Sequence, residues 1–178
     1  RLLGHRASYV TEYIFRRSTY SLKGGFPDYP VAWCADDAAW FSFAGDGPIL
    51  TIAGPRVRWR SSRINITGAN RSYQTQKLEA GRKFLNFIEN EVEPGAVNHS
   101  ADEWNEARSI WFEKQVRYLS PLKLSLIQAV IEVDSPWNRP RIERAILAIM
   151  WTVKGHFREV LSRLTKDKKQ PSLKAPTW

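Results

Sequence analysis

The chain has 178 residues, a net charge of +9 at neutral pH and a hydrophobic fraction of 43%. A chain of this length can bury a substantial core, and its single cysteine, Cys34, excludes an intrachain disulfide. It contains no run of about 18 apolar residues, so we expect no membrane span and a cytoplasmic protein. We expect one domain over residues 1–165, followed by a flexible basic tail over residues 166–178.

The first third of the chain predicts short strands joined by tight turns. Its segments are rich in β-branched and aromatic residues, and clusters of glycine and proline lie between them. The segments that we predict as strands are residues 9–15, 31–34, 38–43, 49–53, 57–61 and 63–67.

Helical patterns follow in the middle of the chain. Apolar residues at spacings of three and four predict a helix through residues 78–92, in which Gly81 indicates close packing against a neighbour. Ser100 and Glu103 have the spacing of a capping box, so a second helix is predicted over residues 102–119.

The last helix has the clearest pattern in the sequence, and a short apolar helix over residues 122–133 precedes it. Its stripe of apolar side chains extends over about six turns, and we predict that it packs in the core. The stripe consists of Ile142, Ile146, Ile149, Val153, Phe157, Val160 and Leu164. Strands followed by a cluster of helices are typical of an α+β fold, here a small mixed sheet with a helical C-terminal half.

The positive charge is distributed unevenly along the chain. Seven basic residues and one acid lie between Arg56 and Arg82, whereas seven acids and a single arginine lie between Asn86 and Glu113. The segment from Lys154 to the end carries seven basic residues and two acids. Such blocks are typical of surfaces that meet a charged partner, and the excess of cations favours DNA, RNA or an acidic protein.

The segment INITGANRSYQTQKLEAG, residues 64–81, turns from a predicted strand into a predicted helix. Unpaired N–H groups at a helix N-terminus carry partial positive charge, so such a corner suits an anion. Gly68 lets a phosphate approach the backbone, Asn70 offers amide donors, and Arg71 can hold phosphate oxygens bidentately. Ser72 can cap the helix or contact a phosphate. Many strand-to-helix turns carry a glycine and a cation without binding phosphate, so both interpretations stay open.

These residues resemble the strand-Gly-x-x-Arg-helix motif of the ParB/sulfiredoxin superfamily, which reads Gly-Glu-Arg-Arg in ParB proteins and Gly-Cys-His-Arg in sulfiredoxins. Here the motif reads Gly68-Ala69-Asn70-Arg71. The stretch IENEVEPGAVNHSADEWNEA, residues 88–107, is also similar to ParB, and the whole resemblance covers residues 49–107. Ala69 stands where sulfiredoxins have their cysteine nucleophile, so sulfinic-acid reduction is not expected. Asn70 departs from the paired arginines of ParB.

Within that superfamily, the size and basic charge are similar to those of the plasmid fertility-inhibition, or oncogenic-suppression, proteins. This resemblance implies binding and hydrolysis of ATP with Mg²⁺ or another divalent cation, and DNase (nuclease) activity on plasmid DNA or T-DNA. It also implies that conjugative transfer through a type IV secretion system is blocked, with the coupling protein or relaxosome as a partner.

The resemblance also indicates candidate site residues. The candidate nucleotide-binding residues are Gly68, Ala69, Asn70, Arg71, Ser72 and Asn90. The candidate catalytic residues are Arg71, Glu89 and Glu91, and Glu89 is also the candidate metal ligand, because carboxylates can hold Mg²⁺ and orient water. Either glutamate, taken alone, can equally be an ordinary surface residue on the solvent-exposed face of a helix.

A basic segment supplies candidate DNA contacts. On a strand, the arginines of residues 56–60 point to one face and the apolar residues between them point to the other. The arginine face could follow a DNA backbone. The candidate DNA-binding residues are Arg56, Arg58, Arg60, Arg63 and Lys77. A basic solvent face of an edge strand explains the same pattern equally well.

Two further hypotheses about function stay open. One is a non-enzymatic inhibitor that binds a coupling protein or relaxosome and blocks substrate entry. The other is a DNA-binding partition or regulatory factor, although reading a palindromic site usually needs a dimeric helix-turn-helix, and none is clear in the sequence.

Overall fold

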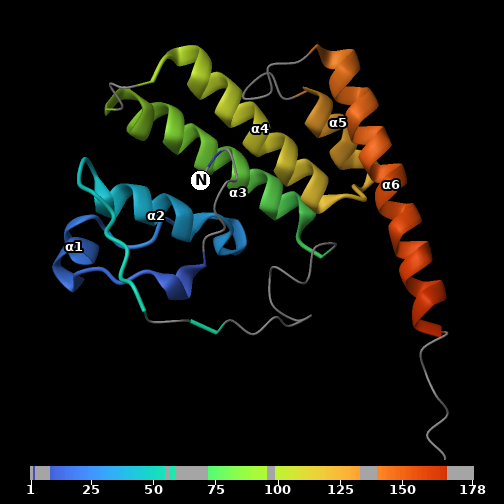
Figure 1. The fold of residues 1–178 in the computed structure, drawn as a ribbon. Helices are drawn as coiled ribbons and strands as arrows, with labels where there is room; N and C mark the ends of the chain where they lie inside the picture. The colour runs from blue at the N-terminus through green and yellow to red at the C-terminus, as the bar shows by residue number, and fades with distance from the viewer. Residues whose placement is uncertain are drawn as a thin grey trace, which may run out of the picture.

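The computed structural model describes residue 2 and residues 9–54, 57–58, 72–95, 99–132 and 140–167. The regular structure in these ranges is helical, and Figure 1 shows the arrangement. The α-helices are α1 (Arg17–Leu22), α2 (Ala35–Ala44), α3 (Gln74–Phe87), α4 (Ala101–Leu119), α5 (Leu124–Glu132) and α6 (Arg141–Asp167). Short 3-10 turns lie at Val10–Glu12, Pro30–Ala32 and Glu93–Gly95, and a π-helical turn, Ile88–Val92, directly continues α3.

The predicted mixed sheet is absent from the part of the chain that the structure describes. The α+β assignment, with its ParB/sulfiredoxin-like sheet, is therefore wrong, because the described residues form no strand. The predicted strands that fall wholly on described residues and form other structure are 9–15, 31–34, 38–43 and 49–53. The predicted strand 63–67, most of 57–61 and the tail beyond Asp167 lie outside the described residues.

Helix α2 explains one of these errors. Residues 38–43 form a short apolar run, and periodicity alone cannot assign such a run to a strand or a helix. Ala38 and Ala39 are almost completely buried, and alanine is the best helix former. Asp36 and Asp37 lie in the first turn of α2, where the helix dipole favours carboxylates.

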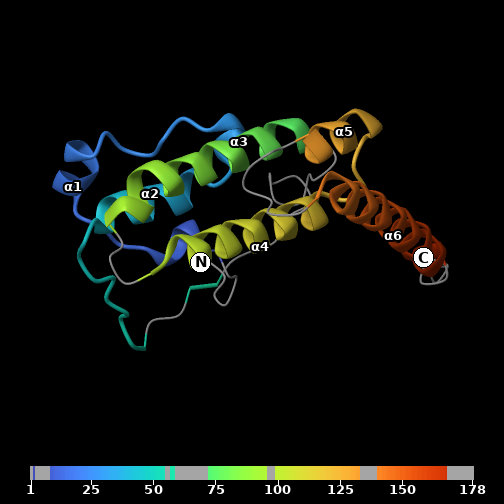
Figure 2. The ribbon, with the colours of Figure 1, turned by 90° about the horizontal axis from the view of Figure 1, so that it is seen from above.

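Helices α3 and α4 form the centre of the molecule, where they lie side by side and run in opposite directions (Figures 1 and 2). The predicted apolar stripe of α3 faces the core, with Phe84, Leu85 and Ile88 at most 2% exposed. Gly81 lies against the Trp111 ring of α4, since a Cβ at Gly81 would be 3.4 Å from the ring. The predicted close packing at this glycine is confirmed.

Aromatic rings pack within the N-terminal segment and join it to α3. Phe15, Phe26 and Phe43 cluster with Trp40 of α2, with ring centroids 5.1 to 6.1 Å apart. Phe41, on α2, contacts Phe84 of α3 at a centroid separation of 6.4 Å. The loop between α1 and α2 lies beside the C-terminal end of α3.

The predicted capping box at the start of α4 is confirmed. The Ser100 hydroxyl accepts from the Glu103 N–H at 3.2 Å, and the Glu103 carboxylate accepts from the Ser100 N–H at 2.7 Å. The predicted C-terminal end of this helix, Leu119, is also confirmed.

A buried glutamine attaches the start of α3 to the turn between α4 and α5. The Gln74 Nε2 group donates to the carbonyl oxygens of Leu119 at 2.8 Å and Pro121 at 2.6 Å. The Gln74 Oε1 atom accepts from the Lys123 N–H at 3.3 Å. The N-terminus of α3 is thus fixed against protein backbone.

Helix α6 packs its N-terminal part against α5 and α4, and its second half extends past the other helices (Figures 1 and 2). The face that it turns inward includes Ala148, Trp151 and Gly155. Gly155 approaches the α4–α5 turn so closely that a Cβ there would lie 2.8 Å from the Pro121 nitrogen. None of the described helices, α6 included, is both long and apolar enough to cross a membrane.

Candidate functional site

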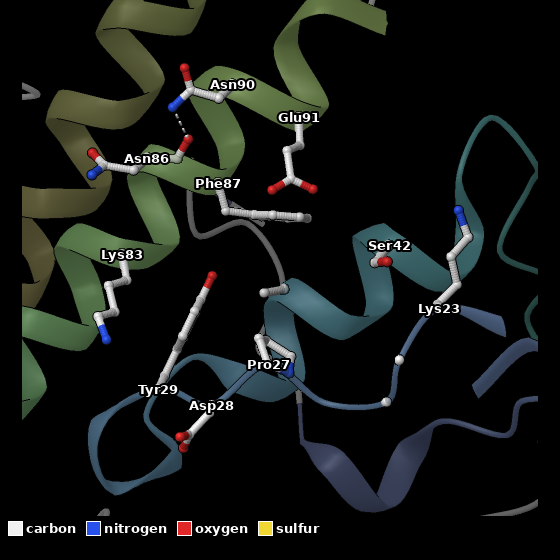
Figure 3. A pocket seen from close by; sticks show the side chains of 13 residues that line it. Lys23, Pro27, Asp28, Tyr29, Ser42, Lys83, Asn86, Phe87, Asn90 and Glu91 are labelled. Atoms are coloured by element: carbon white, nitrogen blue, oxygen red, sulfur yellow. Dashed lines mark hydrogen bonds between the residues drawn. The ribbon is translucent and has the colours of Figure 1, made fainter. Parts of the chain in front are cut away.

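A pocket of about 520 Å³ opens between the α1–α2 loop, α2 and the C-terminal end of α3 (Figure 3). Two of the predicted site residues, Asn90 and Glu91, line it. The sequence did not indicate the others that carry polar groups into it, which are Lys23, Asp28, Tyr29, Ser42, Lys83 and Asn86. The loop GGFPDYP, residues 24–30, was visible as a turn, but nothing in it showed that it folds back onto α3.

The loop that forms one side of the pocket depends on two glycines. Gly24 and Gly25 have φ values of 75° and 82°, which favour glycine. Tyr29 follows in this loop, and its hydroxyl is directed toward α3 (Figure 3). Burial raises the pKa of Tyr29 to about 12, with smaller contributions from the charges of Cys34 and Glu91.

The charged side chains that line the pocket balance one another. Lys23 and Lys83 are offset by Asp28 and Glu91, so the formal charges of these side chains cancel. The Asn90 amide already donates to the backbone carbonyl of the lining residue one helical turn earlier, at 2.7 Å. A triphosphate gains no electrostatic preference from a balanced lining of this kind.

Glu89 is not among the lining residues and lies instead in an ion-pair cluster with α4. Its carboxylate is 3.8 Å from the guanidinium of Arg108, a residue that is only 4% exposed. Arg108 also bonds to Glu93 and, at 2.6 Å, to Asn105. This cluster attaches the π-helical turn to α4. Among the described residues, no three His, Cys, Asp or Glu side chains gather as a metal-binding group.

The predicted phosphate corner lies mostly outside the described residues, which exclude Gly68, Ala69, Asn70 and Arg71 and begin again at Ser72. Ser72 is exposed and lies just before α3. From the first residue of α3 to Asn90 the chain is helical, a rise of roughly 24 Å at 1.5 Å per residue. The structure therefore does not bring Ser72 together with Glu89, Asn90 and Glu91 in one pocket.

Of the predicted DNA contacts, the structure describes only Arg58 and Lys77. Arg56, Arg60 and Arg63 lie outside the described residues, and Arg58 is exposed. Lys77 is 1% exposed, with its ammonium 4.4 Å from the centroid of the Trp33 ring. Burial lowers the pKa of Lys77. An ammonium in this position is not available to a DNA backbone, so the DNA role predicted for Lys77 gains no support.

The outward face of α6 is the largest departure from the expected core. Ile142 is 71% exposed, Val153 61% and Phe157 64%, and the other described members of the stripe, Ile146, Ile149 and Val160, are also exposed. The prediction that this stripe is core is therefore wrong for these six residues. We call them the α6 outer face. Most apolar patches on monomeric proteins are small, and a larger one marks an interaction site.

Neither a scan against protein-family models nor searches of curated proteins and solved structures found a match to this chain.

Proposed function

We propose that the protein is a non-enzymatic inhibitor that acts by docking onto another protein through the α6 outer face. In line with its resemblance to fertility-inhibition proteins, the target is a coupling protein or relaxosome of a type IV secretion system, and docking blocks entry of plasmid DNA or T-DNA. The exposed apolar face of a helix that extends past the bundle carries this proposal.

The shape and composition of α6 support docking. A helix with one apolar face can lie in an apolar groove, with anchors at spacings of three and four residues. Ile146, Ile149 and Val153 have this spacing and are more than half exposed. Lys154 is exposed at the edge of this face, so a groove with carboxylates at its border complements it.

The ATP-dependent nuclease receives less support than docking. Among the predicted nucleotide-site residues that the structure describes, Ser72 lies just before α3, whereas Glu89, Asn90 and Glu91 lie beyond its far end. The balanced charges around Asn90 and Glu91 also give no preference for a polyanion.

The DNA-reading factor is likewise less well supported. Helices α4 and α5 follow each other through a short turn, as in a helix-turn-helix. However, α5 (Leu124–Glu132) contains no lysine or arginine, whereas recognition of DNA relies heavily on such side chains.

A binding measurement with the purified protein tests the proposal. The immobilised cytoplasmic part of a coupling protein, or an assembled relaxosome, should capture wild type but not Phe157→Asp. Leu124→Asp is the matched control, because Leu124 is an 84% exposed apolar residue on a different helix, α5. Capture of Phe157→Asp as strong as that of wild type would contradict docking through this face.

A second experiment separates docking from catalysis. Arg71→Ala should bind the target as wild type does. Calorimetry with ATP, CTP and Mg²⁺, followed by a plasmid-nicking assay, should show no activity that depends on Arg71. ATP binding and DNA cleavage that both disappear in Arg71→Ala would instead support the nuclease.

A further inference from the structure

We infer that, when no target is bound, a second copy of this chain covers the α6 outer face, with the two α6 helices packed antiparallel about Val153. This inference rests on the proposed function, in which the face is a docking surface for protein. It goes further by naming the occupant of the face in the resting state.

The spacing of the apolar side chains is symmetric about Val153. Ile146, Ile149, Val153, Phe157 and Val160 follow one another at intervals of three, four, four and three residues. Reversing the helix direction leaves these intervals unchanged. In an antiparallel pair centred on Val153, each copy therefore presents the same pattern to the other, which is the condition for an isologous two-fold interface.

The same stripe repeats every eleven residues, which keeps it on one side of a long helix. Ile142 and Val153, Ile146 and Phe157, and Ile149 and Val160 are each eleven residues apart. A repeat of eleven residues corresponds to about 3.67 residues per turn, close to that of a straight α-helix. Two such helices can stay in contact along the whole stripe without strong supercoiling.

The position of α6 leaves room for this pairing. The inward face of the helix, which includes Ala148, Trp151 and Gly155, is already packed against the rest of the chain. The outer face lies on the opposite side, and the second half of α6 extends past the bundle (Figure 2). One pair of helices forms a small interface, below about 1,200 Å² in total, of the kind found in weak and reversible complexes.

Charge distinguishes a second copy from an acidic partner. Each chain carries a net charge of +9, and α6 itself contains six basic and three acidic residues. Two copies repel each other at long range, so added salt should tighten their association by screening this repulsion. Added salt should weaken the binding of an acidic target, because it screens the attraction between opposite charges.

Sedimentation equilibrium of the full chain at several protein and salt concentrations tests the inference. Wild type should dimerise with a Kd that falls as salt is added, and Leu124→Asp should behave as wild type does. Phe157→Asp should raise the dimer Kd by more than about tenfold, because a charge would have to be buried in each half of the interface. A wild type that is monomeric at every concentration, or a Phe157→Asp variant that dimerises equally well, would overturn the inference.

Disulfide crosslinking tests the geometry without adding a charge. In a Cys34→Ala background, Val153→Cys should form a disulfide between chains. Ile142→Cys should not, because antiparallel pairing puts the two copies of that residue about 33 Å apart. Efficient crosslinking through Ile142→Cys, or none through Val153→Cys, would overturn the antiparallel pairing. If wild type is monomeric but is still captured by the coupling protein or relaxosome, only the inference of a second copy is refuted. If wild type dimerises but is not captured, only the proposed function is refuted.

Discussion

Tyr29 shows how the surroundings of one side chain set its chemistry. The ordinary pKa of a tyrosine is 10.0, and burial first, then the charges of Cys34 and Glu91, raise that of Tyr29 to about 12. The folded state therefore favours the protonated phenol. The resulting stability is fully present below pH 10 and is lost as the pH rises toward 12.

This arrangement predicts the effect of removing one negative charge from the pocket. Glu91→Gln should lower the folded-state pKa of Tyr29 without returning it to 10, because burial is the larger cause. An NMR titration of the labelled tyrosine ring measures this pKa. Glu89→Gln is the control, because Glu89 does not line the pocket. An equal decrease in the pKa with both variants would contradict the assignment of the effect to Glu91.

Gln74 is the residue whose loss should most disturb the junction of α3 with the α4–α5 turn. Gln74→Ala removes three hydrogen bonds and leaves two carbonyls and one N–H of the turn without this partner. We expect a loss of about 2–4 kcal/mol in the free energy of unfolding. Denaturant unfolding measures it, with the exposed Gln76→Ala on the same helix as control. Equal small effects of the two substitutions would mean that this junction contributes little.

At the scale of elements, the approach of α6 to the α4–α5 turn depends on a residue without a side chain. An alanine is normally about 1 kcal/mol better than glycine within a helix. At Gly155, however, the new Cβ would lie 2.8 Å from the Pro121 nitrogen, so the backbone must move. We expect Gly155→Ala to destabilise the protein by about 1–3 kcal/mol, the usual range for overpacking.

Gly81→Ala provides the comparison for this prediction. Its Cβ would lie 3.4 Å from the Trp111 ring, a side chain that can shift slightly. The stabilisation from the higher helix propensity of alanine and the destabilisation from crowding should then nearly cancel in the free energy of unfolding. Thermal unfolding of both variants measures the difference. A Gly155→Ala variant as stable as Gly81→Ala would show that α6 is not held tightly against the turn.

The helices that could be predicted are those with a signal in their own sequence. The capping box requires only Ser100 and Glu103, three positions apart in the sequence. The α3 stripe is visible as a regular spacing of apolar residues. The residues of α2 gave no such signal, because a short apolar run fits a strand as well as a helix. The pocket was not predictable either, because its loop and α3 come together only through long-range packing.

The error at α6 has a different physical cause. A regular apolar stripe indicates that a helix face avoids water, but it does not indicate whether the cover comes from the same chain. The sequence indicated the apolar stripe, and only the structure showed that its described members, between residues 142 and 160, are exposed. The predicted grouping of Ser72 with Glu89 and Asn90 failed because an unbroken helix separates them.

At the scale of the whole molecule, the described helices form a compact group from which α6 extends. The chain therefore exposes apolar surface while carrying a net charge of +9. This charge weakens association between copies at low ionic strength and favours acidic partners. These two properties are the basis of the proposed exchange between a resting pair and a docked inhibitor.

The central claim is that inhibition depends on the α6 outer face and not on a nucleotide site. The most direct test measures the frequency of plasmid transfer from donor cells that make equal amounts of wild type, Phe157→Asp, Leu124→Asp or Arg71→Ala. We predict that Phe157→Asp alone loses inhibition, while Leu124→Asp and Arg71→Ala block transfer as wild type does. Loss of inhibition in Arg71→Ala with full inhibition by Phe157→Asp would contradict the account.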